Sequence, residues 1–225
     1  MSALAIQHND PAPVVATRRA IEGVEPTVLA DIYQSDANMV IWQRGAIDEL
    51  AQAADCILEK YPNLQASLTV APQSACAAVS EALGATEVAL ALSEDIAQLV
   101  DMFCCLFDLK RAGVRLTALD RAMCPRFHVD RVPCRLVTTY RGVATQWLPH
   151  HFVDRSKLGA GSQGKPDEES GLFDRATDIQ QLNQGSVALL KGELWEGNEN
   201  AGLVHRSPAI KSEQRRLLLT LDFIG

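Results

Sequence analysis

The chain has 225 residues, of which 47% are hydrophobic and 22% are charged, a balance typical of a globular protein with its own core. A formal net charge of −7 argues against broad binding to nucleic acid or to an anionic membrane, because both require a basic surface. No apolar stretch is long enough to span a membrane, and the N-terminus lacks the pattern of a signal peptide. We therefore expect a cytoplasmic protein without membrane or nucleic-acid partners.

The first half of the chain is predicted to be rich in helix. Residues 1–25 are polar and contain proline, so we expect a loosely ordered segment ahead of a single domain over 26–225. Apolar spacing and end signals predict helices over residues 26–34, 45–62, 73–85 and 93–113, and short strands over 38–44 and 66–72. Ser93 is the expected N-cap of the longest helix.

The sequence pattern changes from helical to strand-like after residue 113, where short runs of β-forming residues are separated by glycine and proline. We expect strands over residues 114–121, 126–132, 134–142, 186–195, 201–207 and 215–223. A helix-rich part over 26–113 and a β-rich core over 114–225 predict an α+β fold with the helices outside an antiparallel sheet or barrel. The segment 154–185 is rich in glycine, serine and charge, and is expected to be either a mobile surface loop or a lid over a site.

The cysteines do not have the spacing of a zinc-ribbon or thioredoxin motif, because none of them form a CxxC pair. There are six of them: Cys56, Cys76, Cys104, Cys105, Cys124 and Cys134. Most are interpreted as small core residues in a reducing compartment. Cys124 and Cys134 flank a candidate metal-binding segment, however, and could add soft ligands that favour zinc.

That segment is "FHVD", in which His128 and Asp130 lie two residues apart. Side chains alternate between the faces of a strand, so these two would project from the same side. An imidazole and a carboxylate suit a first-row metal such as Fe(II), and a second histidine would complete a triad with open coordination positions. The pair alone is weak support, because a hydrogen-bonded couple without metal has the same pattern.

The C-terminal region supplies His205 and, ten residues later, the pair Arg215 and Arg216. In "RRLLLTLDF", every second residue from Arg215 onward lies on one face of the strand, and that face is apolar apart from the arginine. We expect this face to line the mouth of the barrel. A buried arginine needs a partner, and a dicarboxylate co-substrate would supply one. The alternative is that both arginines are solvated at the end of a strand.

An HxD pair, a distant histidine and an arginine about ten residues further on resemble the Fe(II)/2-oxoglutarate-dependent oxygenases of the double-stranded β-helix (jelly-roll or cupin-like) fold. The resemblance implies that His128, Asp130 and His205 hold iron. It also implies that Arg215, with Arg216 as the second choice, binds the far carboxylate of 2-oxoglutarate.

The stretch "TTYRGVATQWLP" is similar to the sequence that follows HxD in some of these oxygenases, which places Tyr140 beside the co-substrate. It departs from them where Val143 and Ala144 replace a Pro-Gly pair, which affects the turn that positions Tyr140. Further candidate pocket residues are Trp147, His150 and Cys134. His150 and its neighbour would face opposite ways on a strand, so they could equally be surface residues.

Several longer stretches, among them "AMCPRFHVDRVPCRLVTTYRG" and "TQWLPHHFVDR", resemble a bacterial family known as domain of unknown function 1826. The resemblance covers nearly the whole chain after its N-terminal segment. Members of that family are often encoded near zinc-homeostasis genes, which implies a role under zinc limitation. The expectation is therefore an oxygenase that acts on an unknown small-molecule or protein substrate. The alternatives are a non-enzymatic zinc-binding protein of metal homeostasis and a metal-free scaffold.

Overall fold

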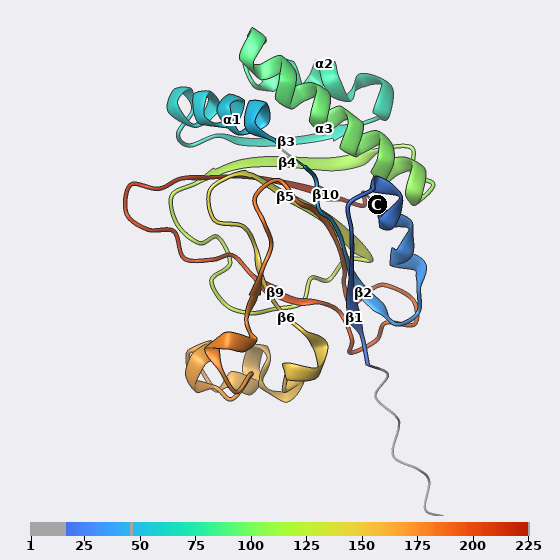
Figure 1. Ribbon diagram of the computed structural model, residues 1–225, viewed down its shortest axis with the longest axis vertical. Helices are drawn as coiled ribbons and strands as arrows, with labels where there is room; N and C mark the ends of the chain where they lie inside the picture. Colours follow the sequence, from blue (N-terminus) through green and yellow to red (C-terminus); the bar gives the residue numbers. More distant parts are fainter. Residues whose placement is uncertain (1–16, 46, 225) are drawn as a thin grey trace, which may run out of the picture.

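The structure, a computed structural model, describes residues 17–45 and 47–224. Its strands form two sheets (Figure 1). The order in the large sheet is β1 (Arg19–Gly23), β2 (Ala37–Trp42), β8 (Val187–Lys191), β5 (Cys134–Arg141), β10 (Arg216–Asp222), β4 (Ala112–Leu119) and β3 (Gln65–Val70). The order in the small sheet is β7 (Gln180–Gln181), β6 (Gln146–Leu148) and β9 (Val204–Arg206).

Neighbouring strands in both sheets are antiparallel, except that β1 runs parallel to β2. The expectation of a loosely ordered segment over residues 1–25 is wrong for Arg19–Gly23, because this stretch adds a strand to the sheet edge. Residues 1–16 lie outside the described residues. The β core is also not confined to 114–225, since β1, β2 and β3 come from the first half of the chain.

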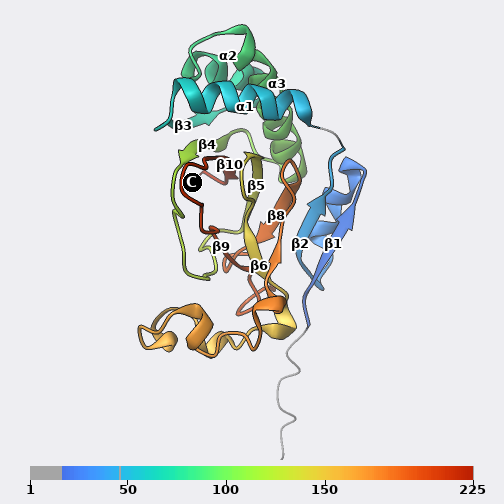
Figure 2. The same cartoon turned by 60° about the vertical axis from the view of Figure 1, so that its left-hand side comes forward.

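The longer helices cover one face of the large sheet, as the sequence predicts for an α+β fold (Figures 1 and 2). They are the 3₁₀ helix η1 (Pro26–Tyr33) and the α-helices α1 (Asp48–Lys60), α2 (Pro72–Ala82) and α3 (Glu87–Leu106). Leu217, Leu219 and Leu221 of β10 pack beneath them and are fully buried. The apolar face of the last strand therefore meets the helices, and the expectation that it lines a barrel mouth is wrong.

The opposite face of the large sheet packs against the small sheet. Met39 and Ile41 of β2, Val137 of β5 and Trp147 of β6 belong to one apolar cluster between the two sheets. Because side chains alternate along each strand, the residues that face this space in β10 are Arg216, Leu218 and Thr220. The space between the sheets is therefore partly apolar and partly polar.

The segment 154–185 is neither strand nor α-helix for most of its length. After η2 (His150–Phe152) it forms short 3₁₀ turns: η3 (Arg155–Lys157), η4 (Gly159–Ser162), η5 (Asp167–Glu169) and η6 (Ala176–Asp178). Leu172 and Phe173 pack with Phe127, Leu148 and Val204 in a cluster of their own. The segment thereby covers the outer face of the small sheet, at the foot of the molecule in Figure 1.

Two predicted elements differ from those observed. The longest helix begins at Glu87, not at residue 93, and its N-cap is Thr86, whose hydroxyl accepts a hydrogen bond from the Ala89 amide. Ser93 lies inside the helix, where its hydroxyl donates to the Ala89 carbonyl. Residues 126–132 form no strand beyond one isolated bridge at His128. In the described part of the chain, no helix has the length and apolar character needed to cross a membrane.

Candidate metal centre

The centre begins with a backbone pairing between two segments that are 77 residues apart in sequence. The His128 amide donates to the His205 carbonyl, and the His205 amide donates to the His128 carbonyl, each at 3.0 Å. In an antiparallel pair, residues directly opposite one another project their side chains to the same face. The two imidazole rings accordingly lie together, with centroids 4.6 Å apart.

Asp130 brings its carboxylate to both rings. One carboxylate oxygen lies 3.5 Å from His128 Nε2, and the other lies 3.4 Å from His205 Nε2. The ligand atoms of the three residues all lie within 4.8 Å of one another. Three ligands about 2.1 Å from one ion and at right angles are about 3 Å apart, so a small closing movement would complete a facial triad.

The outer nitrogen of each ring is held by the backbone. His128 Nδ1 lies 2.9 Å from the Arg126 carbonyl, and His205 Nδ1 lies 3.3 Å from the Leu203 carbonyl. A carbonyl can only accept, so these contacts favour a proton on each Nδ1, and each Nε2 faces the centre, where it can bind a metal ion once it has lost its proton. Metal-binding histidines are usually oriented by such a second contact.

Arg135 orients the carboxylate. Its Nη1 donates to Asp130 at 2.7 Å, and its Nε and Nη2 donate to Asp222 at 2.7 and 3.0 Å. Arg135, a residue of β5, thus links Asp130 to Asp222 at the end of β10. It fixes Asp130 on an irregular segment where no sheet ladder does so.

The charges in the centre favour the ionised carboxylate. Burial acts to raise the pKa of Asp130, but contacts with His128 and His205 and the charge of Arg135 outweigh it and hold that pKa well below its usual range. The contact with Asp130 raises the pKa of His128. An ionised carboxylate beside two imidazoles is the donor set that a divalent first-row metal requires.

A cavity of about 70 Å³ lies at the two histidines, and it also contains an arginine. It is lined by His128, His205 and Arg216 among others. Arg216 is 1% exposed, and burial lowers its pKa to about 10. Its guanidinium donates to the hydroxyls of Thr139, Thr145 and Ser207, at 2.7–3.3 Å. Among residues 17–45 and 47–224, it forms no ion pair with a carboxylate.

Arg215, the first choice for the carboxylate site, lies elsewhere. It is exposed, and its guanidinium donates to the Pro62 carbonyl on the helical side of the molecule. Adjacent residues of a strand project to opposite sides, so only one of the two arginines can face the centre. The structure places Arg216 there, which corrects the order of the two candidates.

Tyr140 and Cys134 are also turned away from the centre. Both belong to the core under the helices, and the Tyr140 hydroxyl donates to Asp95 of α3 at 2.6 Å. Burial raises the pKa of the Cys134 thiol. The expectation that these two residues line the pocket is therefore wrong, because the pocket side of β5 carries Arg135 and Thr139.

The remaining candidates lie around the centre without joining it. Trp147 is buried between the sheets and pairs with His205 across β6 and β9. His150 is buried beside Arg155, whose Nη2 lies 3.2 Å from His150 Nδ1, and it does not belong to the triad. Cys124 is exposed and lines the cavity.

Sequence reasoning missed Arg135, Thr139, Thr145 and Ser207. The signal that could have found the first two is the alternation along β5, since both share the face that Tyr140 and Cys134 do not. No such signal exists for Thr145 and Ser207, which lie outside the strands and reach Arg216 through the tertiary fold.

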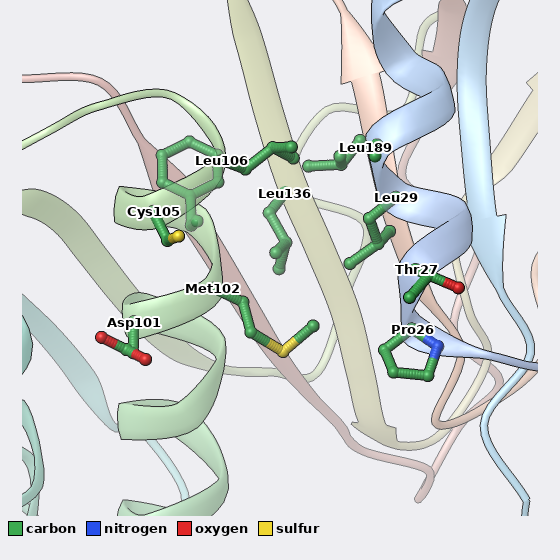
Figure 3. Close-up of a pocket in the computed structure, with 11 residues that line it drawn as sticks. Pro26, Thr27, Leu29, Asp101, Met102, Cys105, Leu106, Leu136 and Leu189 are labelled. Carbon is green, nitrogen blue, oxygen red and sulfur yellow. The ribbon is translucent and has the colours of Figure 1, made fainter.

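A larger and more apolar hollow, of about 370 Å³, lies between η1 and α3 on the helical side of the large sheet. Figure 3 shows Leu29, Met102 and Leu136 pointing into it from η1, α3 and β5. Asp101 at its edge is the one ionisable side chain, apart from Cys105, that lines it in the described structure. It lacks the convergent polar groups of the metal centre.

Comparison with solved structures finds similar chains at low sequence identity. The chain is similar to the rice dioxygenase for auxin oxidation, with 12% identity, a TM-score of 0.51, and coverage of 92% of this chain and 83% of that one. Weaker similarity is found to a Pseudomonas putida prolyl-4-hydroxylase, with 11% identity, a TM-score of 0.47, and coverage of 88% and 98%. A full-length Neurospora crassa protein in complex with alpha-KG and 5-formyluracil gives 10% identity, a TM-score of 0.48, and coverage of 99% and 87%.

At these identities the similarity to the rice enzyme concerns the fold alone, which is oxygenase-like. No curated protein matches the chain. The family described as "Protein of unknown function (DUF1826)" matches residues 23–222, which include the helices, the strands apart from most of β1, and all three residues of the candidate metal centre. The chain belongs to this family.

Proposed function

We propose that the protein is a non-haem Fe(II)/2-oxoglutarate-dependent oxygenase with a double-stranded β-helix core. The observation that carries the proposal is Arg216, a buried guanidinium with no carboxylate partner among the described residues, in the cavity that His128 and His205 also line. The packing of the small sheet against the large one, with the triad at one edge of the small sheet, supports the proposed core.

A buried cation without an anion is costly, and hydroxyl groups compensate it only in part. Arg216 is held by Thr139, Thr145 and Ser207, which accept its hydrogen bonds but carry no charge. A dicarboxylate would neutralise the guanidinium with one end through strong charge-assisted hydrogen bonds. Its other end would then lie toward the triad, which fits 2-oxoglutarate.

The donor set fits Fe(II), since His128, Asp130 and His205 form a facial 2-His-1-carboxylate group and leave other coordination positions open. When bound, iron supplies the oxygen chemistry. The chain's own part is to fix the two histidines through the Arg126 and Leu203 carbonyls, and to orient Asp130 through Arg135.

A second cavity would give the substrate that is oxidised a route to the metal. It has a volume of about 330 Å³ and lies between η3–η5 and the segment Arg126–His128. His128 lines both this cavity and the one that contains Arg216. The substrate would therefore approach the metal beneath the turns of segment 154–185, separately from the co-substrate.

The test is anaerobic purification, loading with Fe(II), and measurement of succinate formed from 2-oxoglutarate in the presence of O₂. Arg216→Gln should raise the KM for 2-oxoglutarate by about 100-fold, equivalent to about 3 kcal/mol for a lost bidentate ion pair. Arg215→Gln is the matched control, because its guanidinium lies on the other side of the sheet, and it should leave that KM unchanged.

Absence of succinate formation by the iron-loaded protein would overturn the proposal. If the two substitutions changed the KM for 2-oxoglutarate equally, the assignment of Arg216 to the co-substrate site would be contradicted even with turnover.

The second candidate is a zinc-binding protein of metal homeostasis, and Cys124 favours it. This exposed cysteine lines the same cavity as His128 and His205, and a thiolate is a preferred zinc ligand. A site closed by a fourth protein ligand is structural or serves transport, whereas a catalytic site keeps a position open. Tight zinc binding that Cys124→Ser weakens, without 2-oxoglutarate turnover, would favour this candidate.

A further inference from the structure

The segment 154–185 contains one carboxylate that contacts both histidine-bearing segments. Asp167 of η5 is 4% exposed. Its Oδ2 accepts a hydrogen bond from the Phe127 amide at 2.8 Å and from Arg206 Nη1 at 3.4 Å, and its Oδ1 accepts from Arg126 Nε at 2.7 Å.

These partners are next to the metal ligands in sequence. Phe127 precedes His128, and Arg206 follows His205. The two are also in contact with each other, because the Arg206 guanidinium lies over the Phe127 ring at 4.3 Å. The buried carboxylate of Asp167 therefore links Phe127 to Arg206, and these are the residues next to His128 and His205.

The segment around His128 has few other restraints. It forms one isolated bridge with His205 and no continuous strand, so the usual ladder of hydrogen bonds does not fix the position of the ring. Apart from that bridge, the backbone bonds nearest to the ligand are the one from the Phe127 amide to Asp167 on one side and the one from the Glu193 amide to the Asp130 carbonyl on the other. A buried acceptor with two arginines and an amide around it is well satisfied and rigid.

We propose that Asp167 is a positioning residue of the metal centre, through which segment 154–185 holds His128 and His205 at the separation that metal binding requires. This role rests on the metal centre of the proposed function and adds to it. The segment is then an outer brace of the centre as well as a cover for the small sheet. Outer contacts of this kind typically change metal affinity by about 10- to 100-fold.

The test compares Asp167→Asn with Asp178→Asn in the full chain, using Co(II) alone as the probe. Asp178 is a matched control, because it is 3% exposed, lies in the same segment, and contacts the backbone and side chain of Arg175 near it in sequence. Co(II) titration followed by the visible d–d absorption gives both the Kd and the geometry of the bound ion. The Asp167→Asn protein should bind about 10- to 100-fold more weakly, with a shifted band, and Asp178→Asn should match the wild type.

Thermal unfolding without metal shows whether each variant is folded. If Asp167→Asn does not fold, Arg126→Gln replaces it. The Arg126 side chain is half exposed, and its substitution removes one of the three contacts of Asp167. It should weaken Co(II) binding several-fold. Wild-type affinity and spectrum in a folded Asp167→Asn or Arg126→Gln variant would overturn the positioning role alone. Absence of Co(II) binding by the wild type would overturn the metal centre, and this inference with it.

Discussion

At the scale of single residues, neighbours in sequence have opposite environments. Arg216 is buried among three hydroxyls, while Arg215 is exposed and contacts a carbonyl on the helical side. His150 is buried against Arg155, while His151 is exposed. The chemistry of such a residue depends on the side of the chain from which it projects more than on its type.

His150 should make stability depend on pH. Burial, and the charge of Arg155, lower its pKa to about 4, compared with about 6.5 for a free histidine. Between these values the unfolded chain binds the proton and the folded chain does not, so stability is lost as the pH falls from about 6.5 to about 4. Between pH 7 and pH 5 the loss attributable to His150 should be about 2 kcal/mol.

Urea unfolding at the two pH values measures this loss. In His150→Asn the free energy of unfolding should depend less on pH than in the wild type by that amount. His151→Asn is the control and should keep the wild-type dependence, because His151 is exposed. A wild-type pH dependence in His150→Asn would show that the imidazole is not held neutral.

At the scale of elements, apolar spacing located the helices but not all of their ends. The spacing in α1 and α3 predicts amphipathic helices, and their apolar residues are buried against the large sheet. The start of α3 was missed because Ser93 has the side chain of an N-cap but lies in a helix that packing extends to Glu87. A hydroxyl that donates to a carbonyl four residues earlier is compatible with a helix interior.

The two hydroxyls of α3 should therefore differ in their effect on stability. Thr86→Ala removes the acceptor for the Ala89 amide and should lower the free energy of unfolding by about 0.5–1 kcal/mol. Ser93→Ala should change it by less than about 0.5 kcal/mol, since alanine favours a helix interior and the carbonyl keeps its bond within the helix. Chemical denaturation of both variants tests the assignment, and a larger loss in Ser93→Ala would contradict it.

At the scale of the whole molecule, the metal centre joins segments that come from different parts of the chain. His128 and Asp130 lie on an irregular segment before β5, and His205 lies on β9 of the small sheet. The brace through Asp167 comes from a third region, and Arg216 comes from the last strand of the large sheet. Binding at this centre should consequently stabilise the packing of the two sheets.

A metal ion that binds only the folded state should raise stability by mass action. At Co(II) concentrations of about 100 times the Kd, the free energy of unfolding should rise by about 2.7 kcal/mol, which corresponds to a Tm increase of about 5–10 °C. A chelator should reverse the increase. Differential scanning calorimetry measures it.

His205→Ala should abolish the increase, because the ion then loses the ligand supplied by the small sheet. His151→Ala should retain it, since that ring is exposed and lies outside the triad. An equal Tm increase in His205→Ala and the wild type would place the bound ion at another site.

By itself, the sequence determined most of the stretches that become helix or strand and which residue types could meet a metal, but it missed the strand Arg19–Gly23 and wrongly predicted one over 126–132. The alternation in "RRLLLTLDF" and the helical spacing of "DELAQAADCILEK" state which side of each element is apolar, because burial requires a matching period. The HxD spacing, together with the resemblance to Fe(II)/2-oxoglutarate-dependent oxygenases, identified His128, Asp130 and His205 as a candidate group.

Only the tertiary structure decided what each face meets. The apolar face of β10 packs under the helices, so Arg216 and not Arg215 enters the centre, and Tyr140 and Cys134 turn away from it. Asp167, Thr145 and Ser207 reach the centre or its supports from loops, where no period marks the direction of a side chain. Periodicity is a local property of the chain, whereas the partner of each face depends on how two sheets and a helical layer close on one another.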